Sequence, residues 1–411
     1  MSEEIRVEMA HDDGAVLVGT AYFHVARGQI STTFRYSDDY LSSRWAYPID
    51  PLLSLSAAPF SVPGLPGCFS DCAPDRWGRN LVAKQHRRLV GEGIARDRRL
   101  TDVDYLLGVS DETRQGALRF RHSIAEEYLG SGTHIPKLLS LPELQRAADD
   151  AAEGSDVAIK RLLEAGTGSL GGARPKASVL GDDGTLMIAK FSRETDDWNV
   201  IAWEALSLRL AQSAGISVPV NRLLTIDERP VLLLQRFDRT GNRRHGYISA
   251  MTAAGRRDGE PADYLDVVEA IEDLSGRWRR DCEALFRRLV FSVATHNTDD
   301  HLRNHGFVRT ESGWELSPAF DINPQPSLVV DRQTGINGVT ETDDEAEALL
   351  EFAGLCHLTI PAARRIMVDV AEAVGQWRQH AAALPITSTD LDRIGSAIET
   401  QVDRVKNAAG A

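Results

Sequence analysis

The sequence is poor in cysteine and has no long hydrophobic run. Its 411 residues include four cysteines, Cys68, Cys72, Cys282 and Cys356. No second cysteine pair or close histidine pair completes a zinc site around Cys68 and Cys72. Such sparse cysteines exclude a disulfide scaffold, so we expect four reduced thiols in a cytosolic protein.

Signals for secretion or membrane insertion are also missing. No stretch approaches the roughly 18 apolar residues of a membrane span. The first residues, Met1–Arg6, have neither the basic nor the apolar region of a signal peptide. We therefore expect a cytoplasmic protein that does not contact a membrane.

Basic charge is not in excess either. The formal net charge is −14, and an acidic balance argues against general coating of nucleic acid, which needs a surplus of Lys and Arg. A local basic patch remains compatible with this balance. The length predicts two to three compact units, and 42% hydrophobic residues are enough for an ordinary globular core.

The distribution of strand and helix patterns predicts an α+β chain in three parts. Residues 1–125 mix short strands with a helix near 77–88, and residues 126–245 form a β-rich lobe with one main helix near 198–214. Residues 246–411 form a helical lobe, interrupted by a short β-turn-β stretch near 305–320. A β-rich lobe followed by a helical lobe is the order of two-lobed kinases, here with an additional N-terminal mixed α/β subdomain.

The strongest chemical signal is the segment Asn297–Asn304. Phosphoryl transfer needs a carboxylate that orients the acceptor hydroxyl and an oxygen ligand for magnesium, and kinase loops supply them as Asp, four residues, then Asn. Asp299 and Asn304 have this spacing and Asp300 does not, so Asp299 is the predicted base. His301 in the same loop is a candidate ATP contact.

A second acidic motif follows at Leu316–Pro324. A mainly apolar stretch ends in Asp321, whose position fits that of a second magnesium-binding carboxylate. Mg²⁺ prefers such oxygen ligands. Asn304 and Asp321 are therefore the predicted metal ligands. Ile322 and Asn323 stand where eukaryotic kinases have Phe-Gly, which argues against the eukaryotic type.

Glycines are concentrated in Gly166–Lys176. Gly166, Gly168 and Gly171 match G-x-G-x-x-G, but a helix precedes and a strand follows, so this is not a Rossmann turn, and no Walker A loop occurs. Glycine backbones can approach phosphates closely, although a flexible linker is the structural alternative. The candidate ATP contacts are Gly168, Ser169, Leu170, Gly171, Gly172, Ala173 and Lys176.

A lysine on an apolar strand is the next signal. Lys190, in Met187–Phe191, needs an anionic partner, which nucleotide phosphates or Glu204 on the following helix would provide. The strand of Leu232–Leu234 then ends in Gln235–Arg239. If this is the segment between lobes, Gln235, Phe237 and Asp238 would contact the nucleoside.

Together these motifs resemble the HipA family. Gly168–Lys176 looks like its Gly-rich loop, and Gln235–Arg239 is similar to its E-R-F-D-R motif with Gln in place of Glu. Asn297–Asn304 is similar to N-T-D-x-H-x-K-N with Arg303 in place of Lys. The motifs at Leu316–Pro324, Leu106–Gly108 and Gly116–Phe120 extend the resemblance over most of the chain.

The resemblance implies a kinase-like fold, ATP and Mg²⁺, and phosphorylation of Ser or Thr in a protein of the translation machinery, such as an aminoacyl-tRNA synthetase, which arrests growth. It implies autophosphorylation at Ser169. It also implies a HipB-like helix-turn-helix antitoxin through which alone the kinase would reach DNA. A small-molecule phosphotransferase and a catalytically silent interaction protein are the alternatives left open.

Overall fold

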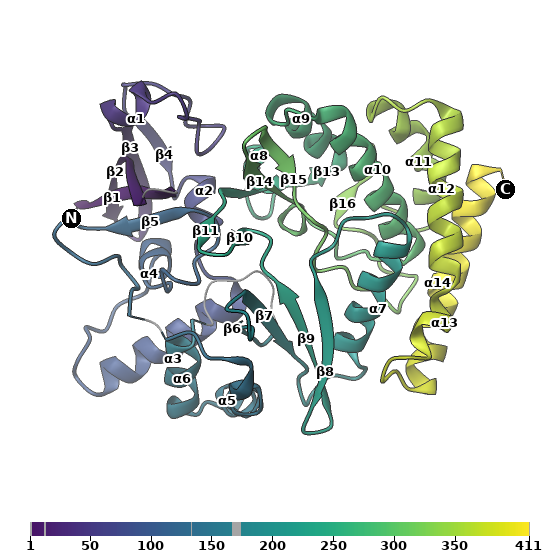
Figure 1. Ribbon diagram of the computed structural model, residues 1–411, viewed down its shortest axis with the longest axis horizontal. Coiled ribbons are helices and arrows are strands. Elements are labelled where there is room, and N and C mark those ends of the chain that lie inside the picture. The colour runs from purple at the N-terminus through teal and green to yellow at the C-terminus, as the bar shows by residue number, and fades with distance from the viewer. Residues whose placement is uncertain (1, 12–13, 133, 167–173, 411) are drawn as a thin grey trace. The chain divides into compact units, whose positions relative to one another are not determined.

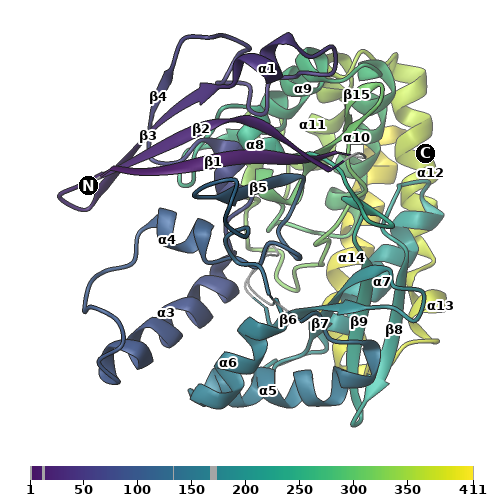
Figure 2. The ribbon, with the colours of Figure 1, turned by 60° about the vertical axis from the view of Figure 1, so that its left-hand side comes forward.

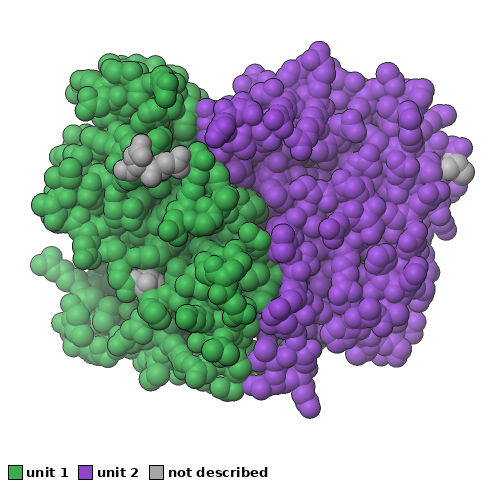
Figure 3. Space-filling model, in the orientation of Figure 1, with its two compact units in different colours: residues 1–194, 233–248 green, residues 195–232, 249–411 purple. Residues whose placement is uncertain are grey.

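The computed structural model describes residues 2–11, 14–132, 134–166 and 174–410 (Figure 1). They form two compact units. Unit 1 contains residues 1–194 and 233–248, and unit 2 contains residues 195–232 and 249–411 (Figure 3). Unit 1 thus groups the N-terminal module with the residues up to 194, and a separate subdomain at 1–125 stays a prediction.

Unit 1 begins with an antiparallel sheet in the order β4-β3-β2-β1-β5 (Figure 1). Its strands are β1 (Ser2–His11), β2 (Gly14–Ala26), β3 (Gln29–Tyr36), β4 (Phe60–Pro63) and β5 (Leu118–Arg121). Phe34 and Phe120 each pack edge-on against Phe69, with ring centroids 6.0 and 5.3 Å apart. These buried rings form the core under the sheet.

The described α-helices of unit 1 lie between and after these strands. They are α1 (Asp38–Ser42), α2 (Gly67–Ser70), α3 (Arg76–Gly91), α4 (Asp102–Leu107), α5 (Leu141–Glu153) and α6 (Asp156–Glu164). Asp75 caps α3 by accepting a hydrogen bond of 2.6 Å from the Gly78 N–H. Gly154, in the left-handed conformation, ends α5 and separates it from α6.

The Gly-rich region leads into a β-hairpin of unit 1. β6 (Lys176–Leu180) pairs antiparallel with β7 (Leu186–Phe191) through a turn in which Gly184 has φ 80°. β9 (Arg229–Gln235) neighbours β7, and its last residues, 233–235, belong to unit 1. The hairpin β10 (Arg239–Thr240) and β11 (Arg243–Arg244) follows.

Unit 2 is mainly helical. Its helices are α7 (Val200–Ser213), α8 (Ala250–Ala253), α9 (Tyr264–Leu274), α10 (Trp278–Ala294), α11 (Glu345–Leu355), α12 (Ile360–Gly375), α13 (Trp377–Ala381) and α14 (Ser388–Ala409). α10 buries Leu285, Phe286, Leu289, Val290 and Val293, the stripe expected from helical spacing. Figures 1 and 2 show α12 and α14 side by side.

Short strands of unit 2 are β8 (Asn221–Ile226), β13 (Ala262–Asp263), β14 (Gly306–Thr310), β15 (Gly313–Leu316) and β16 (Thr334–Gly335), while β12 (Tyr247–Ser249) crosses the boundary between the units. β14 and β15 form the antiparallel hairpin expected near 305–320. All four cysteines are buried and none forms a disulfide, as predicted. Among the described residues, no helix is both long and apolar enough to cross a membrane.

Candidate active site

The predicted catalytic loop begins where α10 ends. Thr295 follows the last helical residue, and His296 takes a left-handed conformation with φ 53° that turns the chain away from the helix axis. His296 Nε2 lies 2.8 Å from the Ser327 carbonyl oxygen, which holds this turn. The helix end therefore fixes where the loop Asn297–Asn304 starts.

Asp299 is an exposed carboxylate with few constraints. Its Oδ1 accepts a hydrogen bond of 2.5 Å from Gln333 Nε2, and its backbone carbonyl accepts one of 3.2 Å from Asn304 Nδ2. The second bond keeps Asn304 beside Asp299. Although Asp299 is accessible to solvent, the surrounding protein removes part of the water around its carboxylate, which raises its pKa despite the opposing effect of His301. Repulsion by Asp321 and Asp300 adds to the rise.

Asp300 has the opposite environment. Its buried carboxylate accepts a hydrogen bond of 2.5 Å from the Tyr264 hydroxyl and lies 2.9 Å from His305 Nε2. Burial alone would raise the pKa of Asp300, but His305, Tyr264 and Arg332 together lower it. Asp300 is thus a structural anchor of the loop, and Asp299 is the carboxylate left available for chemistry.

Asp321 follows β15 in a strained position. Its φ of 58° lies in the left-handed region, which non-glycine residues rarely adopt and which is enriched at functional sites. Asp321 and Asp299 repel each other strongly enough to affect the pKa of Asp299. Among the described residues, the buried side-chain oxygen of Asn323 has no hydrogen-bond partner.

This donor set fits a magnesium ion. Mg²⁺ is held by one or two carboxylates and other hard oxygens, and a cation there would relieve the repulsion between the two aspartates. No cluster of three or more His, Cys, Asp and Glu ligands occurs in the described part of the chain, so a closed all-protein metal cage is absent there. Ligation by Asn304 and Asp321 stays a prediction.

The predicted nucleotide contacts lie mostly in unit 1. Residues 167–173, with Gly168, Ser169, Leu170, Gly171, Gly172 and Ala173, lie outside the described residues. Lys176 is buried, and its Nζ donates a hydrogen bond of 2.6 Å to Asp75 Oδ2, which ties β6 to the start of α3. Lys190 is buried on β7. Glu204, on α7 of unit 2, is also buried, and its pairing with Lys190 stays a prediction.

The predicted hinge contains a buried ion cluster around Asp238. Arg236 donates to both carboxylate oxygens at 2.7 and 2.6 Å, and Arg239 Nη1 donates to Oδ2 at 2.7 Å. Burial opposes ionisation, but these two cations hold the pKa of Asp238 well below its usual range. With these donors engaged, Asp238 anchors the segment, and its contact with ribose stays a prediction. Phe237 lies 6.0 Å from the Tyr247 ring, and Gln235 ends β9.

Sequence reasoning missed the buried loop of residues 109–116, which joins the hinge to the Gly-rich region. Its backbone accepts hydrogen bonds from the hinge: Thr113 O from Arg236 Nη1 at 2.7 Å, and Gly116 O from Arg239 Nη1 at 3.1 Å. The Gly116 N–H in turn donates to Asp238 at 2.8 Å. The Thr113 hydroxyl also donates a hydrogen bond of 3.0 Å to the Gly166 carbonyl oxygen, at the edge of the Gly-rich segment.

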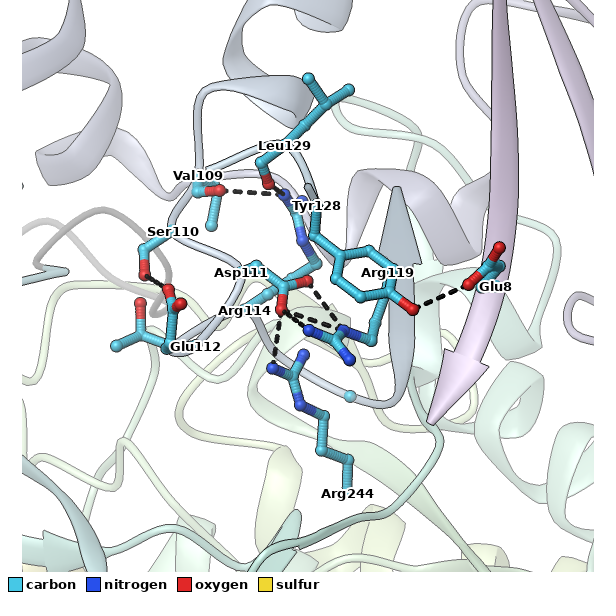
Figure 4. Close-up of polar contacts among 12 residues, drawn as sticks. Glu8, Val109, Ser110, Asp111, Glu112, Arg114, Arg119, Tyr128, Leu129 and Arg244 are labelled. Carbon is cyan, nitrogen blue, oxygen red and sulfur yellow. Dashed lines mark hydrogen bonds and ion pairs between the residues drawn. The ribbon is translucent and has the colours of Figure 1, made fainter. Parts of the chain in front are cut away.

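Asp111 fixes this loop from the other side, as Figure 4 shows. Its fully buried carboxylate accepts hydrogen bonds from Arg119 and, at 3.0 Å, from Arg244 of β11. The ring of Tyr128 lies under the Arg119 guanidinium, and its hydroxyl donates 2.7 Å to Glu8 of β1. The N-terminal sheet, the loop and the hinge are therefore joined inside unit 1 by charged side chains.

Two parts of the chain match known protein families. The family description HipA-like C-terminal domain matches residues 168–378, and the HipA N-terminal domain matches residues 16–120. The chain belongs to the HipA family.

Individual relatives are distant. The putative kinase Y4mE of Sinorhizobium fredii is 23% identical over 91% of this chain and 93% of its own length. The serine/threonine-protein kinase toxin HipA of Shewanella oneidensis is 23% identical over 54% of this chain and 59% of its own length. A chain of the solved HipA, HipB and operator DNA complex from Shewanella oneidensis shares the fold, with TM-score 0.69 and 15% identity over 98% of this chain and 96% of that one.

These findings confirm three predictions: the HipA family, the kinase-like α+β fold, and the enzyme class of a serine/threonine kinase of the HipA toxin family. The predicted base, Asp299, and the predicted metal ligands, Asn304 and Asp321, lie in one unit of this HipA-family chain. Gln333, which contacts Asp299, is far away in sequence and carries no motif that could have predicted it.

Because Asp300 anchors the catalytic loop of this HipA-family chain, Asp300→Ala should destabilise unit 2. Removing one member of a buried charged network typically costs about 3–5 kcal/mol, since His305 and Arg332 would be left in the interior without this carboxylate. We expect a large fall in the thermal midpoint of unfolding, measured by circular dichroism. A change within the error of the wild-type midpoint would contradict the anchoring role.

Proposed function

We propose that this chain is an ATP- and Mg²⁺-dependent kinase that phosphorylates Ser or Thr of a protein of the translation machinery. The observation that carries the proposal is the contrast between two neighbouring aspartates. Asp300 is buried and hydrogen-bonded, whereas Asp299 is exposed, lies beside Asn304 and is repelled by Asp321. A base and two metal ligands with these properties are what phosphoryl transfer requires.

In this mechanism the Asp299 carboxylate accepts a hydrogen bond from the Ser or Thr hydroxyl and takes up its proton. The hydroxyl oxygen forms a bond to the γ-phosphorus, and the bond to the β,γ-bridging oxygen breaks to release ADP. Asn304 and Asp321 would hold magnesium, which neutralises charge on the phosphate oxygens when bound. The raised pKa of Asp299 favours proton acceptance.

The remaining parts of the proposal rest on the family. We propose autophosphorylation at Ser169 in the Gly-rich loop, where two added negative charges would repel the phosphates of ATP. We also propose that a HipB-like antitoxin binds this chain, because the fold matches a chain from a complex that contains HipB and operator DNA.

The proposal is tested by incubating the purified chain with γ-labelled ATP and Mg²⁺, with and without candidate protein acceptors, followed by mass spectrometry. Phosphate on Ser or Thr of a translation protein is the expected result. If the labelled phosphate is found only on small molecules, the chain is a small-molecule phosphotransferase and the proposal is wrong. A chain that binds no ATP would be an interaction protein.

The metal site can be tested without turnover. Since repulsion by Asp321 helps to raise the pKa of Asp299, Asp321→Asn should lower it. We expect the carboxyl carbon of Asp299, followed by NMR against pH without metal, to titrate at lower pH in this variant than in the wild type. Added Mg²⁺ should lower the wild-type value and have much less effect in the variant. Equal responses to Mg²⁺ would remove Asp321 from the metal site.

A further inference from the structure

One segment of this acidic chain is strongly basic. Residues 76–105, which cover α3, α4 and their connection, contain eight Lys and Arg against four Asp and Glu, a net charge of +4 in a chain of −14. Seven of the eight basic residues are arginine, whose planar fork of donors suits phosphate better than lysine does. Figures 1 and 2 place α3 and this connection at the outer edge of unit 1.

The segment encloses a hollow of about 600 Å³. Its basic lining consists of Arg79, His86, Arg87, Arg98 and Arg99. The rest of the lining is mixed and includes Ile30, Ala83, Leu100, Tyr105 and the acidic residue Asp102. Asp102 is paired with Arg79, so the charge that remains in the hollow is positive and favours an anionic ligand.

Two of these arginines are available for such a ligand. Arg79 pairs with Asp102 at 2.6 Å, and Arg98 pairs with Asp104. Arg87 and Arg99 are exposed and have no ion-pair partner among the residues that the structure describes. Their charges are uncompensated by neighbours and face solvent.

The charge continues past this hollow. A second hollow of about 250 Å³ shares Ala83 and Arg87 with the first and adds Lys84 and Arg193. Arg87 therefore lies between two basic hollows on one helix. We call Arg79, Lys84, Arg87, Arg98, Arg99 and Arg193 the α3 strip. Positive charges spread over two adjoining hollows suit a chain of regularly spaced negative charges better than a single small anion.

We propose that the α3 strip binds the phosphate backbone of a nucleic acid directly. This goes beyond the proposed kinase function and does not rest on it, and it adds a direct contact to the route through an antitoxin. Backbone contacts by arginine give affinity without sequence preference and depend strongly on salt. The acidic remainder of the chain restricts the interaction to this strip.

The test uses the full chain without any antitoxin. Fluorescence anisotropy with short labelled duplex DNA and with RNA of the same length should show binding that weakens steeply as salt rises. Arg87→Gln with Arg99→Gln removes two unpaired charges, so we expect affinity about tenfold weaker and a slope of log K against log salt smaller by about two. The preferred nucleic acid identifies the natural ligand class.

A matched control removes the same charge elsewhere. Arg222 and Arg257 are exposed residues of unit 2, and the double variant Arg222→Gln with Arg257→Gln should bind as the wild type does. The proposal is overturned if neither nucleic acid binds at low salt, or if the control loses as much affinity as the α3 variant. It is also overturned if polyglutamate competes as well as DNA and RNA, because the strip would then accept any acidic polymer.

Discussion

Replacing Asp299 with asparagine should abolish most phosphoryl transfer while the fold remains intact. The amide is isosteric with the carboxylate but cannot accept the proton of the acceptor hydroxyl, and loss of a general base typically costs about 10²–10⁴-fold in rate. The rate of label transfer from γ-labelled ATP measures the effect, and retained transfer would remove Asp299 from the role of base.

Stability should respond differently from activity in this variant. Because the pKa of Asp299 is raised in the folded chain, its ionised form is disfavoured by folding, and its charge reduces stability at neutral pH. Asp299→Asn should therefore unfold at the wild-type temperature or slightly above it. The contrast with Asp300→Ala, which is expected to unfold early, separates the catalytic from the structural aspartate. A thermal midpoint of Asp299→Asn well below that of the wild type would contradict this assignment of the two roles.

Asp238→Asn should produce a large loss of stability. The asparagine keeps the shape but removes the charge that Arg236 and Arg239 share, and these two buried arginines would repel each other without it. Breaking a buried charge network of this kind costs about 3–5 kcal/mol. Chemical denaturation followed by fluorescence measures the change in the free energy of unfolding.

The lowered pKa of Asp238 also predicts how the loss of stability in Asp238→Asn depends on pH. The pKa of Asp238 is lowered in the folded chain, so its contribution is fully present above the unfolded value of about 4 and disappears as pH falls toward the folded value. The difference between wild type and Asp238→Asn should therefore shrink in acid. Glu399→Gln is the control, because its ion pair with Arg378 is exposed and worth at most about 1 kcal/mol. An equal effect of both substitutions would contradict the buried network.

Most secondary structure could be predicted because hydrophobic spacing and turn residues agree locally. α3 (Arg76–Gly91) and α7 (Val200–Ser213) lie close to the helices predicted near 77–88 and 198–214. β1 was not predicted, although Ile5, Val7 and Met9 alternate, because a bulge between Val7 and Glu8 and a buried glutamate interrupt the pattern. Glu8 is buried only because Arg121 and Tyr128, far along the chain, hydrogen-bond to it.

The candidate site was likewise only partly predictable from the sequence. Asp299, Asn304 and Asp321 could be named from spacing, because chemistry fixes which residue types must lie close together in sequence. The environments of Asp299 and Asp300 could not be predicted, because Tyr264, Arg332 and Gln333, which surround them, come from distant segments of the chain. For the same reason the sequence presented Asp238 as a ribose contact, whereas the structure adds its role as an anchor of the hinge.

The bonds between the loop of residues 109–116 and the hinge limit how the chain can be divided. Arg236 and Arg239 find their acceptors on Thr113, Arg114 and Gly116, which the sequence assigns to a separate N-terminal subdomain. If residues 1–125 were removed, the guanidinium groups of Arg236 and Arg239 would remain in the chain but would lose these carbonyl acceptors. The N-terminal part and the hinge are therefore coupled in this chain, and we expect that neither can be replaced without compensating changes in the other.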